Sequence, residues 1–244
     1  MTFQFSNVDP SWQPCLQKAL GAMDQAYLQH LYQNTLWLPG PDKILNAFSL
    51  PLSKVRYILF GESPYPRAAS ANGFAFWDAH VKELWSDKGL SKPVNRATSL
   101  RNIIKMLLVG EKVLDPHHLQ QEHIVKINKE NFVNTNNELF QNFLQHGFLL
   151  LNATLVLQPT EVKTEVKKDA RAWHPFMKTL LEFFLSEKNN VELILFGNIA
   201  NTIQKIVDVS RFKTLYVEHP YNLSFITNPK VLEFFTPLQL LRKK

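Results

Sequence analysis

The sequence predicts an α/β fold with three layers, α/β/α, and a four-stranded, mostly parallel central sheet. Four short apolar runs bounded by turn residues are typical of buried strands: 55–60, 148–151, 191–196 and 213–217. Helical periodicity separates these runs, and strands that alternate with helices favour a parallel sheet between helical layers. The 244 residues suit one large domain or two small ones. Because no linker, repeat or low-complexity segment interrupts the chain, we expect a single domain over 1–244.

Residues 1–37 predict a helical segment packed on this domain. Trp12, Leu16 and Leu20 follow an Asp-Pro-Ser start at helical spacing, and a second periodic stretch covers 25–32. Apolar residues at this spacing are typical of a core face rather than of ligand contacts. A loop and a short helix over 43–48 lead into the first strand.

The middle of the chain is predicted to contain one long helix and much loop. Residues 67–98 are polar or loop-like, and a helix opens at Ser99. Ser99 at this position is typical of an N-cap, and a helix N-terminus also suits a phosphate. The connection over 110–135 carries His117, His118 and His123. Since no carboxylate or cysteine accompanies them at ligand spacing, we expect no metal site.

The last third alternates regularly between helices and strands. We expect helices over 137–146, 173–185, 198–207 and 229–241, and a basic loop over 163–171.

Composition restricts the class of protein. A net charge of +6 suits either simple solubility or a polyanionic partner. The single cysteine, Cys15, excludes a disulfide framework and cysteine-ligated zinc or iron–sulfur sites, and fits a reducing compartment. The N-terminus has no signal-peptide pattern and no run is long enough to span a membrane. We therefore expect a cytoplasmic protein, or a nuclear one if the source is eukaryotic, with no membrane partner.

Polar side chains follow all four predicted strands. Parallel strands place their C-terminal ends at one edge of the sheet, where open α/β sheets hold their sites. Strand-end capping explains any one such residue but not the whole set. The residues expected at this edge are Glu62, Ser63, Tyr65, Asn152, Asn198 and His219.

Seven segments, in order, resemble uracil-DNA glycosylases of the family-1 type, beginning with Pro41–Phe48, which resembles the segment before the first strand. Gly61–Pro66 resembles the water-activating loop, whose family form is Gly-Gln-Asp-Pro-Tyr-His. The other five are similar to the base-stacking segment, the phosphate-gripping helix start, the uracil-reading strand, the helix after the basic loop and the minor-groove loop: 71–76, 99–103, 147–152, 173–176 and 219–224. The match runs from about Leu38 to the C-terminal helix and implies the family's fold.

The resemblance implies a pocket that reads a base flipped out of DNA. Asn152 would pair with the amide edge of uracil, beside Gly61, and Phe76 would stack on the ring. Tyr65 would exclude the methyl group of thymine. His219 would donate a hydrogen bond to the uracil oxygen that gains charge as the bond breaks.

The resemblance also implies contacts to single- or double-stranded DNA. Ser99, Ser224 and the backbone at Gly197 and Asn198 would grip phosphates, and Leu223 would fill the hole left in the base stack. Basic side chains would add salt-dependent affinity, namely Lys163, Lys167, Lys168 and Arg171. The implied protein is a monomer that needs no cofactor and no metal.

Three departures fall within the water-activating loop. Ser63 stands where the family has the aspartate that orients water, Glu62 where it has glutamine, and Pro66 where it has histidine. A serine is no base at neutral pH and brings no negative charge to an oxocarbenium-like transition state. Glu62 restores a carboxylate one residue early, although adjacent residues of an extended chain point to opposite sides.

The sequence leaves two hypotheses open. The first is a uracil-DNA glycosylase that is slow or acts on an altered substrate, with water activation by Ser63 or Glu62 and leaving-group stabilisation by His219. The second is a catalytically inactive module that binds uracil-containing or damaged DNA, or a protein partner.

Overall fold

The structure is a computed structural model that describes residues 3–159, 163–187 and 190–244, without the side chains of 163–166. The chain divides into two compact units. Unit 1 comprises residues 1–75 and 147–215, and unit 2 comprises 76–146 and 216–244. The single domain expected from the sequence stays a prediction. Within the described ranges, no helix has the length and apolar character needed to span a membrane.

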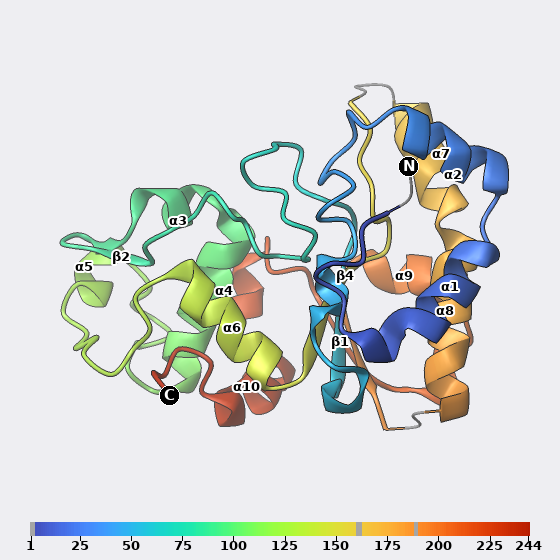
Figure 1. Ribbon diagram of the computed structural model, residues 1–244. Helices are drawn as coiled ribbons and strands as arrows, with labels where there is room; N and C mark the ends of the chain where they lie inside the picture. Colours follow the sequence, from blue (N-terminus) through green and yellow to red (C-terminus); the bar gives the residue numbers. More distant parts are fainter. Residues whose placement is uncertain (1–2, 160–162, 188–189) are drawn as a thin grey trace. The chain divides into compact units, whose positions relative to one another are not determined.

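A four-stranded sheet confirms the predicted α/β fold (Figure 1). Its strands are β1 (Tyr57–Gly61), β4 (Phe148–Asn152), β5 (Glu192–Phe196) and β6 (Lys213–Val217), in the order β4-β1-β5-β6. β1 pairs in parallel with both β4 and β5, in a register that sets Gly61 opposite Asn152. All of β4 and β5 is buried, which explains why both read as continuous apolar runs.

Helices of unit 1 cover this apolar sheet. They are α1 (Gln13–Gly21), α2 (Gln25–Gln33), α7 (Lys163–Ala172), α8 (His174–Glu187) and α9 (Ile199–Gln204). α1 packs on α8. Trp12, just before α1, is fully buried, with ring centroids 5.0 Å from Phe48 and 5.8 Å from Phe184. The N-terminal segment therefore belongs to the core of unit 1.

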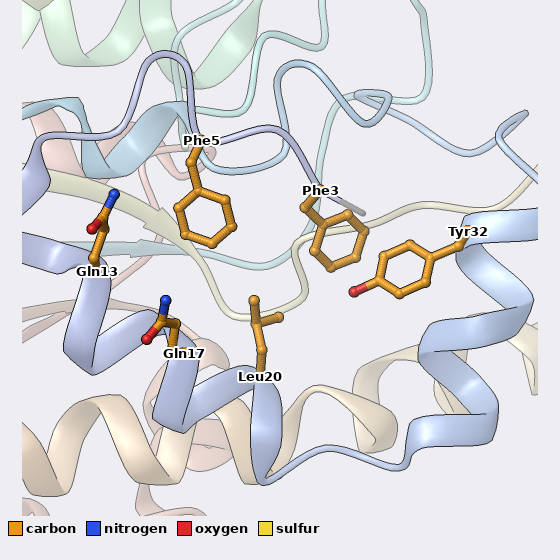
Figure 2. A pocket seen from close by; sticks show the side chains of 6 residues that line it. All are labelled: Phe3, Phe5, Gln13, Gln17, Leu20 and Tyr32. Carbon is orange, nitrogen blue, oxygen red and sulfur yellow. The ribbon is translucent and has the colours of Figure 1, made fainter. Parts of the chain in front are cut away.

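A pocket of about 410 Å³ opens beside the N-terminal segment of unit 1 (Figure 2). The rings of Phe3 and Tyr32 meet edge to face at 4.9 Å, and two glutamines of α1 contribute amide groups. The lining residues are Phe3, Phe5, Gln13, Gln17, Leu20 and Tyr32. None of them is a site residue predicted from the sequence.

Helices are the main regular elements of unit 2. Its helices are α3 (Lys92–Arg96), α4 (Thr98–Gly110), α5 (Gln121–Ile124), α6 (Asn136–Gln145) and α10 (Pro229–Phe235), beside a hairpin of β2 (Trp85–Ser86) and β3 (Gly89–Leu90). A capping box between Thr135 and Glu138 begins α6. Buried asparagines tie helices to neighbouring backbone: Asn142 of α6 donates to the carbonyls of Leu240 and Arg242, both at 2.8 Å.

Short 3₁₀ helices fill several connections. They are η1 (Pro10–Trp12), η2 (Asn46–Ser49), η3 (Leu52–Lys54), η4 (Val209–Arg211), η5 (Leu223–Thr227) and η6 (Thr236–Leu238). η2 occupies part of the short helix predicted over 43–48. The final helix predicted over 229–241 is shorter than expected: α10 ends at Phe235 and a separate turn containing Pro237 follows.

Two further sequence predictions are wrong. The basic stretch over 163–171 is not a loop but α7, because its lysines, glutamate, alanines and arginine are strong helix formers and no glycine or proline interrupts them. Ser99 is not an N-cap: α4 begins one residue earlier, at Thr98, and its cap is Ala97, which supplies no side-chain hydrogen bond.

Candidate active site

The end of β1 lies against the end of β4 with almost no space between them. A Cβ atom added at Gly61 would collide with Oδ1 of Asn152 and come within 2.9 Å of the Cβ of Ala75. Only glycine therefore lets the Asn152 side chain lie across the end of β1. Asn152 itself is 3% exposed.

The loop after β1 has a fixed backbone. The carbonyl of Gly61 accepts from the N–H of Ala153 at 2.9 Å, and the carbonyl of Glu62 accepts from the N–H of Thr154 at 3.0 Å. The loop thus prolongs the β1–β4 pairing beyond the strands. The side chain of Glu62 is exposed, whereas that of Ser63 is half-buried.

Two prolines restrict the rest of this loop. Pro64 is buried and Pro66 exposed, and each fixes its own φ. Tyr65, between them, is half-buried and engaged in interactions of its own. The ring of Tyr65 is consequently presented from a backbone with little freedom.

Local hydrogen bonds in unit 1 hold residues 72–75 of the segment predicted to stack on the base. Asn46 donates to the carbonyl of Asn72 at 2.9 Å, and Oδ1 of Asn72 accepts from the N–H of Phe74 at 3.1 Å. Gly73 has a φ of +89° and lies so close to the carbonyl of Lys43 that no other residue fits. The N–H of Ala75 donates to the carbonyl of Leu150 in β4 at 3.1 Å.

Phe76 begins unit 2 with a left-handed backbone, at a φ of +62°. This conformation is rare for a bulky residue and costs of order 1–3 kcal/mol, so such residues cluster at functional sites. The ring centroid of Phe76 lies 6.0 Å from that of His219, with 34° between the planes. Unit 2 therefore brings these two predicted site residues together.

His219 starts a tight turn. The N–H of Asn222 donates to the carbonyl of His219 at 2.9 Å, and Pro220 occupies the second position of the turn, where its fixed φ is favourable. The N–H of Tyr221 points at Nδ1 of His219 at 3.1 Å. A nitrogen that accepts a hydrogen bond carries a lone pair, so the neutral ring keeps its proton on Nε2. His219 thereby offers an N–H donor on its far side.

Asn102 of α4 contacts the backbone of the same turn. Its side chain is fully buried, and Nδ2 lies 2.7 Å from the carbonyl oxygen of Pro220. The carbonyls of Tyr221 and Asn222 are also within reach of Nδ2, at 3.4 and 3.5 Å. Oδ1 of Asn102 accepts from Nε of Arg101 at 3.3 Å.

The predicted phosphate contacts lie in both units. In unit 2, Ser99 is half-buried in the first turn of α4, where the cap leaves N–H groups without a side-chain acceptor. Ser224 is exposed in η5, next to Leu223, which is 67% exposed. In unit 1, Gly197 takes a φ of +62° after β5, and Asn198 is an exposed N-cap of α9.

The basic helix α7 presents Lys167, Lys168 and Arg171 as exposed side chains. The side chain of Lys163, also predicted to contact DNA, lies outside the described side chains. At the junction with α8, burial and then the positive charges of Arg171 and Lys205 lower the pKa of His174. This part of unit 1 therefore has a positive potential.

Comparison with known proteins shows the family of the chain. A search of protein-family models found no match. The uracil-DNA glycosylase of Amoebophilus asiaticus is 27% identical over 219 residues, which span 88% of this chain and 84% of that protein. The crystal structure of the wild-type UNG from Nitratifractor salsuginis is 44% identical, with a TM-score of 0.91 over 98% of this chain and 94% of that one. The chain belongs to the uracil-DNA glycosylase family.

The fold of this family extends to more distant members. The crystal structure of mimivirus uracil-DNA glycosylase covers 88% of this chain and 70% of its own, with a TM-score of 0.58. At 16% identity, that likeness concerns the fold alone.

Within the glycosylase fold, the predicted site residues form two groups. Unit 1 places Gly61 and Asn152 in contact, with Ser63 and Tyr65 on the loop that follows. Unit 2 places Phe76 beside His219. Sequence reasoning missed Asn102. Its only signal was a polar residue within the apolar run of α4, where eight side chains including its own are buried.

Proposed function

We propose that this member of the family is a uracil-DNA glycosylase that hydrolyses the N-glycosidic bond of a flipped-out uracil, slowly or with an altered substrate. Family membership supplies the reaction class. The departures inside the loop after β1 supply the reduced rate or altered substrate.

The environment of Asn152 carries the proposal. A buried amide usually has hydrogen-bond partners, because leaving it unpaired costs about 1–3 kcal/mol. Asn152 is 3% exposed, and among the described residues no hydrogen bond to its side chain is seen, while its amide atoms remain in reach of solvent and of a ligand. A uracil edge offers one acceptor and one donor, which match the NH₂ and C=O groups of an amide. We infer that Asn152 reads the base.

The chemistry follows from the remaining groups. As the bond between C1′ and N1 of the nucleotide breaks, its electron pair moves onto uracil and the sugar becomes oxocarbenium-like. Nε2–H of His219 is the donor proposed to stabilise the developing uracil anion. A water molecule then adds to C1′ and loses a proton. Phe76 stacks on the base and Tyr65 excludes a 5-methyl group, as the family resemblance implies.

Water activation is the weak step of this proposal. The hydroxyl of Ser63 can hold a water molecule by a hydrogen bond, but it neither removes a proton at neutral pH nor opposes the charge on the sugar. Departure of the leaving group still proceeds with help from His219. We therefore expect slow turnover rather than none.

A glycosylase assay on uracil-containing single-stranded and duplex DNA tests the proposal, with abasic product as the readout. Wild type should release uracil, and Ser63→Asp should release it faster. A slower Glu62→Gln variant would give Glu62 a part in water activation. If neither wild type nor Ser63→Asp releases uracil at low salt, the proposal is wrong.

One observation favours a second candidate, a binding module without catalysis. The Glu62 carboxylate is exposed while Ser63 is half-buried, so the two side chains do not share one environment. A carboxylate directed to solvent does not replace the missing aspartate. Tighter binding to uracil-containing than to plain DNA, with no abasic product from either strand form, would support this candidate. Release of hypoxanthine, xanthine or an alkylated base instead would indicate a changed substrate.

A further inference from the structure

The turn that carries His219 exposes two large side chains. Tyr221 is 68% exposed and Leu223 is 67% exposed, on alternate residues of one loop. Unit 2 buries most of its other large apolar side chains, including the neighbouring Phe225 and Ile226, both at 0% exposure. Exposed apolar groups gathered at one place on a surface indicate contact with another molecule.

The backbone of Tyr221 is fixed although its ring is exposed. Its N–H donates to Nδ1 of His219 at 3.1 Å, and its carbonyl lies 3.4 Å from Nδ2 of the buried Asn102. A ring with two rotatable bonds on an ordered backbone loses little entropy when it is bound.

The ends of the loop are tied together. Nδ2 of Asn228, the N-cap of α10, donates to Oε2 of Glu218 at 2.6 Å. This bond joins the residue before His219 to the residue after η5. The loop between them is consequently a closed, braced structure that presents Tyr221 and Leu223 outward.

We propose that Tyr221 is a second DNA-contacting wedge, whose ring stacks on a base beside the flipped nucleotide while Leu223 enters the space that the nucleotide leaves. The inference rests on the proposed function for its ligand, DNA. Stacking suits this ligand because every base presents a π face to an aromatic ring. The chain's net charge of +6 further favours a polyanion.

Binding to uracil-free duplex DNA that carries a tetrahydrofuran abasic-site analogue tests the proposal without any cleavage. Loss of one base–aromatic stack should raise the Kd of Tyr221→Ala about 5- to 100-fold, and Tyr221→Phe should stay close to wild type. Leu36→Ala is the matched control, because Leu36 is 76% exposed in unit 1, and it should leave the Kd unchanged. Melting temperatures should be unchanged for all three surface variants.

A cross-link locates the contact. With 5-iodouracil placed on either side of the analogue, ultraviolet light should join Tyr221 to the DNA, as mapped by mass spectrometry. The cross-link should persist in Tyr221→Phe and in Leu36→Ala, and disappear in Tyr221→Ala.

A matched pair of variants tests whether the support of the Tyr221 turn by Asn102 matters for binding. Asn102→Ala and Asn142→Ala each remove a buried amide that braces carbonyls of unit 2, but only Asn102 touches the Tyr221 loop. Asn102→Ala should weaken binding and reduce the cross-link, and Asn142→Ala should leave both as in wild type at equal occupancy of the folded state.

Three results would overturn the inference: an unchanged Kd for Tyr221→Ala, equal weakening by Tyr221→Phe and Tyr221→Ala, or no binding of wild type to the analogue. Equal weakening would assign the contact to the hydroxyl and a phosphate. Because the binding assay needs no cleavage, a failure to release uracil would overturn the proposed function and leave this inference standing.

Discussion

The loops at Gly61–Pro66 and His219–Ser224 are built alike but differ in chemistry. Each contains a Pro-Tyr pair, and each has its backbone pinned by hydrogen bonds. The second loop keeps a histidine that offers an Nε2–H donor. In the first loop, Ser63 stands where the family resemblance implies a water-orienting aspartate. Both loops therefore have a fixed backbone, and they differ in the side chains that they carry.

This difference fits a reaction whose barrier is dominated by departure of the leaving group. In such a reaction the donor that stabilises the uracil anion acts at the highest point of the barrier. The group that orients the nucleophile acts on water, which is abundant. If the proposed roles hold, loss of His219 should be more damaging than loss of a water-orienting group at position 63.

The largest expected effect comes from removing that donor. His219→Ala should slow uracil release about 100- to 1,000-fold, as loss of one such donor does elsewhere, while Ser63→Ala should cost less than about tenfold. Single-turnover rates on a uracil-containing oligonucleotide measure both variants. Equal losses in the two would remove the contrast between the loops.

The next largest effect is expected from Gly61→Ala, which tests the close contact between the start of the first loop and Asn152. The added Cβ would displace the Asn152 amide, and a misplaced hydrogen-bonding group costs about 1–3 kcal/mol, or about 5- to 150-fold in kcat/KM. Gly21→Ala is the matched control, because nothing lies within 4 Å of a Cβ at that position. If both glycine variants keep wild-type kcat/KM, Asn152 does not read the base.

A smaller gain is expected from restoring the family's carboxylate. Ser63→Asp should accelerate release about tenfold, below the roughly 100- to 10,000-fold of a fully positioned general base. The gain should appear in kcat rather than KM, since the carboxylate acts on water and not on DNA. A Ser63→Asn variant, which lacks the charge, should show no gain.

The smallest effect concerns the stability of unit 1, which carries the first loop. Burial, followed by the charge of Asp169 and its 2.8 Å hydrogen bond, raises the pKa of Tyr27. The folded state then keeps the phenol neutral where the unfolded chain ionises, near pH 10. Tyr27 therefore stabilises the fold fully below about pH 10, and this stabilisation is lost at about 1 kcal/mol per pH unit above it.

Urea unfolding at pH 8 and pH 11 measures this loss. Tyr27→Phe should be less stable than wild type at pH 8 by about 1 kcal/mol, the value of one hydrogen bond, and should lose less stability at pH 11. Parallel pH dependence in the two proteins would show that Tyr27 titrates as it does in the unfolded chain.

Most of the sheet could be predicted because strands buried on both faces appear in the sequence as continuous apolar runs. β1, β4 and β5 coincide with buried apolar runs that end at turn residues. The expectation of a fourth buried strand is wrong, because no residue of β6, at the edge of the sheet, is buried. The two-residue strands β2 and β3 are too short to show any periodicity in the sequence. By contrast, Ser91 and Pro93 are residues typical of a helix start, and they begin α3. The segment of α7 shows no apolar periodicity that would indicate a helix, and only the helix propensity of its lysines, glutamate, alanines and arginine favours one.

Site residues could be predicted where their function depends on the type of side chain. They could not be predicted where it depends on backbone conformation or on burial. Asn152 and His219 stand out as polar residues after apolar strands. The left-handed φ of Phe76 leaves no trace in the sequence, since glycine and asparagine are the usual residues in that conformation. The role of Asn102 depends on a turn more than a hundred residues away, which local patterns do not encode.

β1 lies between β4 and β5, inside the sheet. Strands so placed open only with the whole fold, so their amides exchange with solvent most slowly. The carbonyls of Gly61 and Glu62 accept hydrogen bonds from Ala153 and Thr154, so the amides of these two residues, just after β4, share that protection. The side chains of Glu62 and Pro66 are exposed and that of Ser63 is half-buried, so substitutions at these positions leave the hydrogen bonds of the sheet intact. We therefore expect the side chains of this loop to tolerate exchange at little cost to the stability of the fold.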